Sequence, residues 1–395
     1  MNRLRLLLAM ASVASFITLV PALAQGKPVT NIGDALFGCA RASDYTSLAG
    51  YALTGEMQKF GRGLLSKVAA GECTLFKTDE AIELTGKQGP TGITQIRPVA
   101  GKATWWTDNE ALHGVKPPLP EGYGKVSSKL YLGKGANQPL LVGLGGAEGG
   151  NAWAGEHHAK QRASILKHGY AFLALAYFQR RPGAPVSIPS ASGIPASLDR
   201  VSLNGVHQAI VKAAKHANIN ASCIAVVGGS RGAELALLLA SHFKDIKAVV
   251  ALAPSDVAYM GTDTLTTSAW MFNDKPVAHI RFDGRALPAL LQGDIKQAMQ
   301  TSRADDPAAK AALIGVQNIH GPVAFMSGVK DHMWDSTSMS QHMMQTLAQA
   351  DFPYAFQHLT LGGGHTAPAQ HMDYALTFLD RYFKTDSATG CARTR

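Results

Sequence analysis

The sequence predicts an α/β protein in which a mostly parallel β-sheet is covered by helices on both faces. Three observations support this fold class. From about residue 125 onward, short apolar runs alternate with longer segments of helical apolar spacing. The apolar runs are nearly continuous, as expected for strands buried on both faces of a parallel sheet. A glycine-rich turn at residues 228–232 also joins one apolar run directly to a helical pattern.

The predicted elements of this domain follow one another along residues 125–385. The apolar runs predict strands at 139–144, 171–176, 224–227, 248–252, 322–326 and 354–361. The helical patterns fall at 156–168, 196–217, 232–243, 336–350 and 367–383. Because strands and helices alternate, the sheet is predicted to be parallel and its helices to pack on both of its faces.

One long segment, residues 256–318, breaks this alternation. It is partly apolar and contains Trp270, Phe272 and Leu290. Long segments of this kind inside a compact domain are usually functional, so we expect a cap over the functional site. Residues 386–395 are predicted to form a C-terminal tail.

Residues 30–115 have a different pattern and predict a small separate module. A helical stretch from 44 to 70 ends at Gly71, and short alternating segments follow up to Trp105 and Trp106. The run from 71 to 107 resembles small bacterial SH3-like modules. We therefore expect a small α+β module, with tryptophans that pack rather than form a binding cage. Residues 116–124 contain three prolines and predict a linker.

The N-terminus has the pattern of a secretory signal peptide over residues 1–24. Arg3 and Arg5 precede an apolar stretch, and a small-residue cleavage site ends at Ala24. We expect cleavage there and a periplasmic or secreted mature chain of 371 residues (395 − 24). The alternative is an uncleaved membrane anchor, which Pro21 and the cleavage site disfavour. No later stretch is long and apolar enough to cross a bilayer.

The charge of the chain gives no support to nucleic-acid binding. The formal net charge is +9, and it falls to +7 (9 − 2) when the two arginines of the signal are removed. The excess is spread along the chain, without a basic block or a stripe of aromatic and basic residues.

The four cysteines suggest disulfides, because the predicted compartment is oxidising. Three pairings of Cys39, Cys73, Cys223 and Cys391 are possible. Cys39–Cys73 is favoured because both lie in the N-terminal segment. Cys223 is either a small apolar residue beside a buried strand or, if the tail reaches it, the partner of Cys391. No cysteine or histidine spacing predicts a metal site, and no cofactor is expected.

The turn Gly228-Gly229-Ser230-Arg231-Gly232 predicts a nucleophilic serine. A strand, a sharp glycine turn with a central serine, and a helix together form a nucleophile elbow. Glycines are needed because neighbouring backbone lies too close for a β-carbon. The start of the helix then places backbone N–H groups beside the serine oxygen, where negative charge develops.

A serine hydroxyl needs a base, which is usually a histidine oriented by a carboxylate. In this kind of fold the three residues follow the order serine, acid, histidine on loops at the carboxyl ends of strands. Asp331 follows the strand at 322–326, and His365 follows the strand at 354–361 through three glycines. These residues are therefore predicted to complete a catalytic triad with Ser230.

Other acids and histidines fit these positions less well. Asp335 lies at the predicted start of a helix, where an N-cap role is the simpler explanation. His358 falls inside a predicted strand and His371 inside a predicted helix. For Asp331 and His365 themselves, the alternatives are a turn aspartate and an ordinary loop histidine.

The loop after the first predicted strand is expected to supply part of an oxyanion hole. Residues 145–150 include four glycines, which let backbone N–H groups point together into a site. We expect N–H groups of Ala147 or Glu148 to act with that of Arg231. A flexible turn is the alternative reading of the same glycines.

With these residues placed, the chain from about 138 to 384 resembles the catalytic domain of the acyl-CoA thioesterase and bile acid-CoA:amino acid N-acyltransferase family. The resemblance lies in residues 163–178, in the elbow 230–237, in the segment 321–336 and in the histidine loop 362–365. It implies an α/β-hydrolase fold, with Ser230 as nucleophile, His365 as base and Asp331 as its orienting partner.

The sequence also departs from that family. Its acyltransferase members carry cysteine at the nucleophile, whereas Ser230 favours transfer to water. Members commonly have an N-terminal β-sandwich, which residues 30–115 do not suggest. The signal peptide sends the chain to a compartment where coenzyme A esters are scarce.

These features predict a secreted serine hydrolase that cleaves a small-molecule ester or thioester through an acyl-enzyme. A carboxylesterase or an acyltransferase of the same fold is one alternative. A catalytically silent envelope protein, in which the SH3-like module contacts a partner, is the other.

Overall fold

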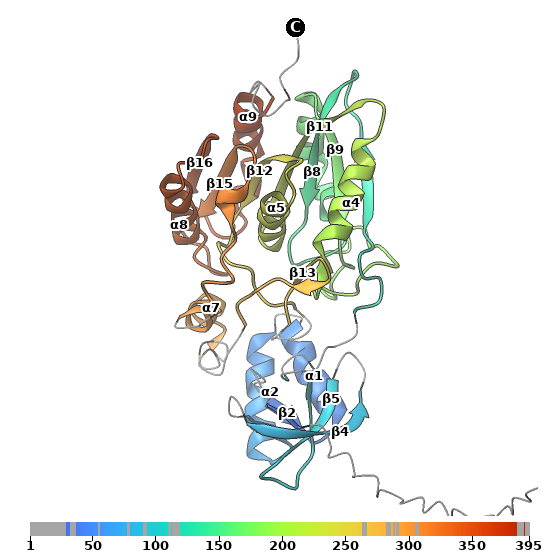
Figure 1. The fold of residues 1–395 in the computed structure, drawn as a ribbon, viewed down its shortest axis with the longest axis vertical. Coiled ribbons are helices and arrows are strands. Elements are labelled where there is room, and N and C mark those ends of the chain that lie inside the picture. The colour runs from blue at the N-terminus through green and yellow to red at the C-terminus, as the bar shows by residue number, and fades with distance from the viewer. Residues whose placement is uncertain are drawn as a thin grey trace, which may run out of the picture.

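The computed structural model shows a large α/β domain and a smaller N-terminal module (Figure 1). It describes residues 29–31, 37–53, 56–76, 80–89, 93–109, 112, 119–262, 267–281, 286, 289, 292–304, 308–384 and 391. The predicted signal peptide, most of the predicted tail and linker residues 116–118 lie outside the described residues.

The large domain is built on a seven-stranded sheet with the order β16-β15-β12-β11-β8-β9-β7. Its strands are β7 (Ser127–Tyr131), β8 (Gln138–Leu144), β9 (Ala171–Ala176), β11 (Ile219–Gly229), β12 (Ile246–Leu252), β15 (Val323–Gly328) and β16 (Phe356–Leu361). All neighbouring strands are parallel except β7, which pairs antiparallel with β9 at the edge. This topology, with a strand–turn–helix elbow after the central strand β11, is the α/β-hydrolase fold.

Helices cover both faces of the sheet, and most residues of its inner strands are buried. One core joins the sheet to α4 (Leu203–Ala214), α5 (Arg231–His242) and α8 (Ser336–Gln349). The opposite core joins it to α3 (Ala159–Lys167) and α9 (Met372–Tyr382). In β9, Leu173 and Leu175 belong to the first core, whereas Phe172 and Ala174 belong to the second. This alternation explains the continuous apolar pattern of the strand.

All six strands predicted for this domain are present, but four features differ from expectation. Edge strand β7 was not predicted, because it is polar and only partly buried. The helix expected at 196–217 begins only at Leu203, after the short strand β10 (Val201–Ser202), and ends at Ala214. The last predicted helix is divided into the 3₁₀ helix η6 (Ala367–Gln370) and α9, and the one at 156–168 into η3 (Glu156–His158) and α3.

The insertion at 256–318 contains β13 (Trp270–Phe272), β14 (Lys275–Pro276), α7 (Ile295–Arg303) and the 3₁₀ helix η5 (Val316–Asn318). Strands β10, β13 and β14 form a small separate sheet. Figure 1 shows β13 and α7 between the main sheet and the N-terminal module.

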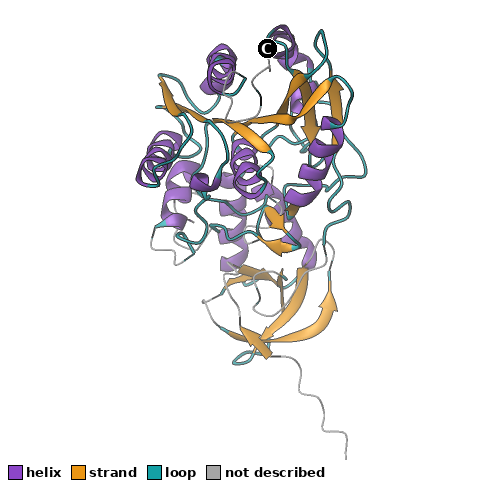
Figure 2. Ribbon diagram, turned by 45° about the horizontal axis from the view of Figure 1, so that its top comes forward, coloured by secondary structure: helices purple, strands orange, loops and turns teal. Residues whose placement is uncertain are grey.

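The N-terminal module combines a six-stranded antiparallel sheet, of order β1-β4-β5-β6-β2-β3, with two helices (Figure 2). Its strands are β1 (Val29–Asn31), β2 (Phe37–Cys39), β3 (Cys73–Leu75), β4 (Ala81–Gln88), β5 (Ile93–Pro98) and β6 (Trp105–Asp108). The single helix predicted at 44–70 is two helices, α1 (Ala42–Leu53) and α2 (Met57–Ala69). Trp105 and Trp106 lie in β6 and pack at the edges of two apolar clusters. The resemblance to SH3-like modules stays a prediction.

The module and the insertion share one apolar core. Phe37, Leu48 and Phe60 from the module belong to the same buried cluster as Tyr259 and Trp334. Residues 119–124 of the predicted linker also lie against the large domain, since Tyr123 Oη donates to Asp274 at 2.8 Å.

Two disulfides are present, Cys39–Cys73 and Cys223–Cys391. The first joins β2 to β3, as favoured from the sequence. The second fixes Cys391, in the predicted tail, to central strand β11, which decides the alternative left open for Cys223. Among the described helices, none is both long and apolar enough to span a membrane.

Candidate active site

Ser230 lies at a strained turn between β11 and α5. Its backbone has φ 55° and ψ −122°, a conformation that non-glycine residues rarely adopt. Strain of this kind persists only where the surrounding structure holds it, and it is common at catalytic positions. The serine is partly exposed rather than packed in the interior.

Close backbone contacts explain two glycines of the elbow. A β-carbon at Gly228 would lie 2.0 Å from the carbonyl oxygen of Gly232. A β-carbon at Gly232 would lie 2.3 Å from the carbonyl oxygen of Gly145. The glycine pattern is therefore required by the turn and by its packing against the loop after β8.

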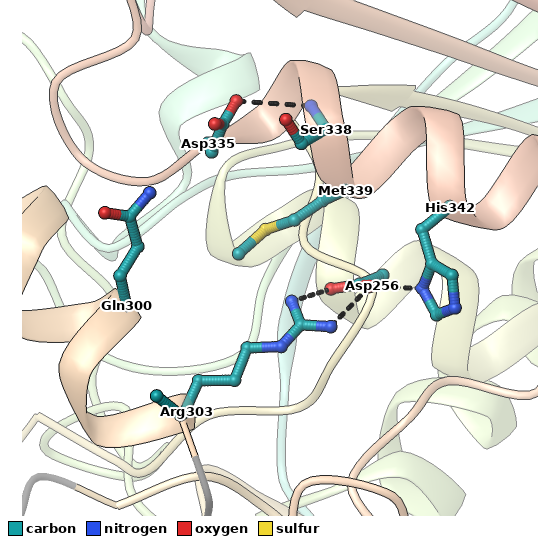
Figure 3. A pocket seen from close by; sticks show the side chains of 8 residues that line it. Asp256, Gln300, Arg303, Asp335, Ser338, Met339 and His342 are labelled. Carbon is teal, nitrogen blue, oxygen red and sulfur yellow. Dashed lines mark hydrogen bonds and ion pairs between the residues drawn. The ribbon is translucent and has the colours of Figure 1, made fainter.

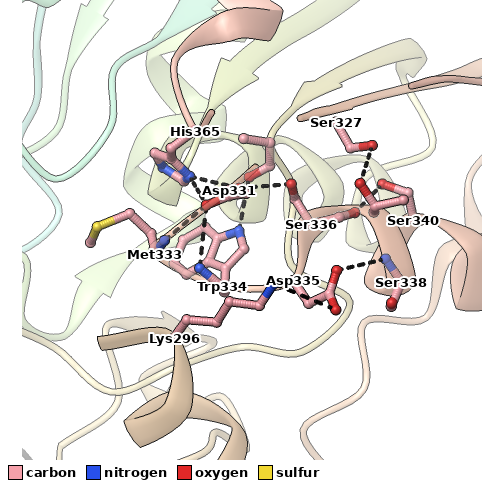
Figure 4. Close-up of polar contacts among 12 residues, drawn as sticks. Lys296, Ser327, Asp331, Met333, Trp334, Asp335, Ser336, Ser338, Ser340 and His365 are labelled. Atoms are coloured by element: carbon pink, nitrogen blue, oxygen red, sulfur yellow. Dashed lines mark hydrogen bonds and ion pairs between the residues drawn. The ribbon is translucent and has the colours of Figure 1, made fainter. Parts of the chain in front are cut away.

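Asp331 and His365 form the hydrogen-bonded pair predicted from the sequence (Figure 4). The Nδ1 atom of His365 lies 2.9 Å from each carboxylate oxygen of Asp331. The Asp331 side chain is 1% exposed and that of His365 is 12% exposed. An imidazole held through Nδ1 presents Nε2 for proton transfer, which is the geometry of a general base oriented by an acid.

Neutral donors complete the surroundings of Asp331. The Ser336 hydroxyl donates to Oδ2 at 2.7 Å, and the Met333 N–H donates to Oδ1 at 2.9 Å. Burial alone would raise the pKa of Asp331, but the His365 interaction and these donors outweigh burial and hold that pKa below its ordinary value. The carboxylate is thus kept ionised beside the imidazole.

The His365 loop packs on the end of the neighbouring strand. A β-carbon at Gly328, the last residue of β15, would lie 2.3 Å from the carbonyl oxygen of Gly364. The Trp334 ring meets the His365 ring edge to face, with centroids 5.2 Å apart. Trp334 Nε1 donates to the carbonyl of Ala253 at 3.2 Å, which ties the segment between β15 and α8 to the end of β12.

Backbone contacts also bring the elbow to this edge of the sheet. The Ser230 N–H donates to the Leu252 carbonyl at 2.9 Å, and the Ala253 N–H donates to the Met326 carbonyl at 2.7 Å. The described contacts include no hydrogen bond between Ser230 Oγ and His365. Catalytic hydrogen bonds are often long before substrate binds, so their absence does not remove a candidate base.

The predicted oxyanion loop lies beside the serine. A β-carbon at Gly146 would lie 3.3 Å from Ser230 Cβ. Among the described residues, no acceptor engages the N–H groups of Ala147 or Glu148. Arg231 begins α5, where N–H groups have no carbonyl of their own helix to bond. All three predicted donors are therefore near the elbow.

Three further Asp–His pairs occur among the described residues, so such a pair alone does not identify a site. They are Asp256–His342, Asp245–His207 and Asp380–His168. The imidazoles of these pairs come from helices α8 and α4 and from the end of α3. In the Asp331–His365 pair, by contrast, both partners follow parallel strands.

The competing residues have structural roles. Asp335 is the N-cap of α8, as expected, and accepts from the Ser338 N–H at 3.2 Å. His358 lies in β16 and contacts the Ser327 hydroxyl at 2.8 Å. His371 precedes α9 rather than lying inside a helix.

A buried polar network beside the elbow was not anticipated. The Arg231 side chain donates to the carbonyls of Tyr259 and Met260 and pairs with Glu234 at 2.9 Å. Glu234 also accepts from Trp270 Nε1. The residue after the nucleophile therefore anchors the insertion to α5. The only sequence signal was a pair of opposite charges, three residues apart, in an otherwise apolar helix.

A cavity of about 500 Å³ opens between α7 and α8 (Figure 3). Arg303 forms two hydrogen bonds with Asp256 at its wall, at 2.6 and 2.8 Å, and His342 Nδ1 lies 2.6 Å from the same carboxylate. None of Ser230, Asp331 and His365 lines it. No group of three or more metal-binding side chains occurs in the described part of the chain.

Comparisons with known proteins agree with the predicted resemblance. Residues 202–369 match the family described as BAAT / Acyl-CoA thioester hydrolase C terminal. The chain is 30% identical over 220 residues to acyl-coenzyme A thioesterase 6 of Mus musculus, covering 55% of this chain and 46% of that protein. It is 26% identical over 226 residues to acyl-coenzyme A amino acid N-acyltransferase 1 of Mus musculus, covering 57% and 47%.

The chain thus spans about half the length of these curated relatives. Among solved structures, a putative dienelactone hydrolase from Klebsiella pneumoniae has a TM-score of 0.40 and 14% identity, covering 65% of this chain and 99% of that one. The match at residues 202–369, which includes Ser230, Asp331 and His365, confirms the resemblance of this region to the BAAT and acyl-CoA thioester hydrolase C-terminal family.

Proposed function

We propose that this chain is a secreted hydrolase that cleaves an ester or thioester through an acyl-enzyme on Ser230. The observation that carries the proposal is the buried Asp331–His365 pair, whose loops follow parallel strands at the edge where the elbow presents Ser230. The two relatives named above are a thioesterase and an acyltransferase, so acyl chemistry is common to both.

The proposed reaction has two steps. Ser230 Oγ attacks the acyl carbon as its proton passes to His365 Nε2, and the N–H groups of Arg231 and Ala147 stabilise the oxyanion. The intermediate expels the alcohol or thiol, which takes the proton from His365. Water then attacks the acyl carbon of the acyl-enzyme and gives a proton to His365. His365 returns this proton to Ser230 Oγ as the acyl–oxygen bond breaks, which releases the acid and restores the serine hydroxyl.

Export is supported by the signal-like N-terminus and by the cysteines. All four form disulfides, which persist mainly in oxidising compartments. In such a compartment the substrate is proposed to be an ester or thioester other than a coenzyme A ester.

The first test is covalent labelling of the mature protein with a fluorophosphonate, followed by hydrolysis of p-nitrophenyl esters and acyl-CoA thioesters. We expect labelling at Ser230 in the wild type and none in Ser230→Ala. His365→Ala should lower kcat by about 10⁴-fold or more while the protein stays folded. A folded wild type that is neither labelled nor active would instead favour the silent, partner-binding alternative.

A further inference from the structure

Hydrogen bonds hold the loop at residues 145–150 on both sides of Ala147. The Gly149 N–H donates to the Gly146 carbonyl at 3.4 Å, and the Gly150 N–H donates to the Phe178 carbonyl at 3.0 Å. The Glu148 carbonyl accepts from the Arg181 N–H at 2.9 Å. These bonds fix the second half of the loop against the segment that follows β9.

Two side chains fix the first half. The Tyr177 hydroxyl donates to the Gly145 carbonyl at 2.5 Å, and the Glu148 carboxylate accepts from the Gly146 N–H at 2.8 Å through Oε1. The backbone of the loop therefore turns at Ala147, whose N–H has no acceptor among the described residues. The N–H groups of Gly146 and Gly149 are already engaged, whereas those of Ala147 and Glu148 are left for another ligand.

The first half of the loop, which Tyr177 and Glu148 hold, is the half that contacts the elbow. A β-carbon at Gly146 would lie 3.3 Å from Ser230 Cβ and 2.8 Å from Glu148 Oε2. The carboxylate and the nucleophile thus lie on the same side of Gly146. A small displacement of the loop would move the Ala147 N–H relative to the Ser230 oxygen, and oxyanion stabilisation depends strongly on that distance.

Tyr177 is suited to a permanent clamp. Its side chain is almost fully buried, and burial together with the nearby Glu148 charge raises the pKa of its phenol well above the ordinary value. The phenol therefore keeps its proton at neutral pH and remains a donor to Gly145.

We propose that Tyr177 and Glu148 are positioning residues that hold the loop so that the Ala147 N–H faces the oxyanion formed at Ser230. The inference rests on the proposed function, because it assigns these side chains to the same reaction. The role of Glu148 is that of a hydrogen-bond acceptor, which an amide oxygen can also fill. Its negative charge is not required and would oppose an oxyanion.

The test compares Tyr177→Phe, Glu148→Ala and Glu148→Gln in the full mature chain. Each is assayed for kcat and KM with a p-nitrophenyl ester, and for affinity toward a boronic acid that forms a tetrahedral adduct with serine. Tyr177→Phe and Glu148→Ala should lose about 10- to 100-fold in kcat and in boronic acid affinity, with KM changed less than threefold, which is the signature of lost oxyanion stabilisation. Glu148→Gln should keep kcat within about threefold of the wild type.

Matched controls make the same chemical changes elsewhere. Tyr374→Phe removes a hydroxyl that donates to Gln357, and Glu156→Ala removes an exposed carboxylate at η3, so both should behave as the wild type. Melting temperatures are measured for every variant. If Tyr177→Phe does not fold, the partly exposed Glu148 pair of variants decides the matter.

The outcomes separate the inference from the proposed function. A folded wild type that reacts with neither fluorophosphonate nor ester overturns the proposed function. An active wild type with unchanged kcat in Tyr177→Phe and Glu148→Ala overturns the clamp alone. Equal losses in Glu148→Gln and Glu148→Ala would also overturn it, because they would assign the role to the charge.

Discussion

Asp331 and Asp256 are nearly identical by simple criteria, yet their surroundings differ in a way that separates catalysis from architecture. Each follows a parallel strand, has a side chain that is 1% exposed, and contacts the Nδ1 atom of a histidine. Asp256 is also held by both terminal nitrogens of Arg303, whereas the other partners of Asp331 are neutral donors.

The two carboxylates differ in which group neutralises their negative charge. The guanidinium of Arg303 neutralises Asp256 with a permanent positive charge, and its fork geometry fixes α7 of the insertion to the start of that segment. No fixed cation of this kind contacts Asp331 among the described residues. Its charge therefore remains available to an imidazole that gains a proton during the reaction. The partners of a buried carboxylate thus indicate its role better than its burial does.

The largest expected effect comes from neutralising each carboxylate in turn. Asp331→Asn should lower kcat about 10⁴-fold, because the amide no longer holds His365 in its working tautomer or stabilises the imidazolium. Asp256→Asn should leave kcat within about threefold of the wild type. Steady-state hydrolysis of a p-nitrophenyl ester measures both, and a loss of similar size in the two variants would remove the distinction drawn here.

The second effect concerns the free energy of unfolding, and here Asp256→Asn is the variant with the clear loss. Asp256→Asn should lower the free energy of unfolding by about 1–3 kcal/mol, since it leaves the partly buried Arg303 without its counter-charge. The value lies toward the lower part of the range for buried pairs because Arg303 is 29% exposed. Urea unfolding followed by circular dichroism measures it, with His342→Gln as the control. His342 is 45% exposed, so that control should change little.

The smallest expected effect is a change in the free energy of unfolding with pH. The folded-state pKa of Asp331 lies below its ordinary value of 3.8, so its ionised form stabilises the fold above that value. This contribution is lost as the pH falls through the folded-state pKa. Between about pH 5 and about pH 3, the wild type should therefore lose more unfolding free energy than Asp331→Asn. Parallel curves for the two proteins would mean that Asp331 is not held ionised as described.

Sequence reasoning reached the proposed catalytic residues because each lies next to a strong local signal. Ser230 is framed by glycines that the close approach of backbone requires, and Asp331 and His365 directly follow apolar strands. Edge strand β7 has no such signal, since its partly exposed residues lack a continuous apolar pattern. The division of the first long helical pattern agrees with the weak helix preference of Thr54 and Gly55.

Other parts of the site depend on contacts between distant segments, which no local pattern records. The bond from Tyr177 to Gly145 joins residues 32 positions apart, and the Arg303–Asp256 pair joins residues 47 positions apart. In the sequence, a tyrosine after an apolar strand looks the same whether or not its hydroxyl binds a distant loop. Asp256 likewise reads as an ordinary loop acid until Arg303 is placed beside it.

The shared core of the N-terminal module and the insertion affects the design of truncated variants. A fragment beginning at residue 119 would keep every residue of the proposed triad, but it would leave Tyr259 and Trp334 without Phe37, Leu48 and Phe60, which belong to the same cluster. Trp334 is also the neighbour of His365. Removing the module would therefore remove part of the apolar core beside the proposed active site. We expect the proposed activity to require the module.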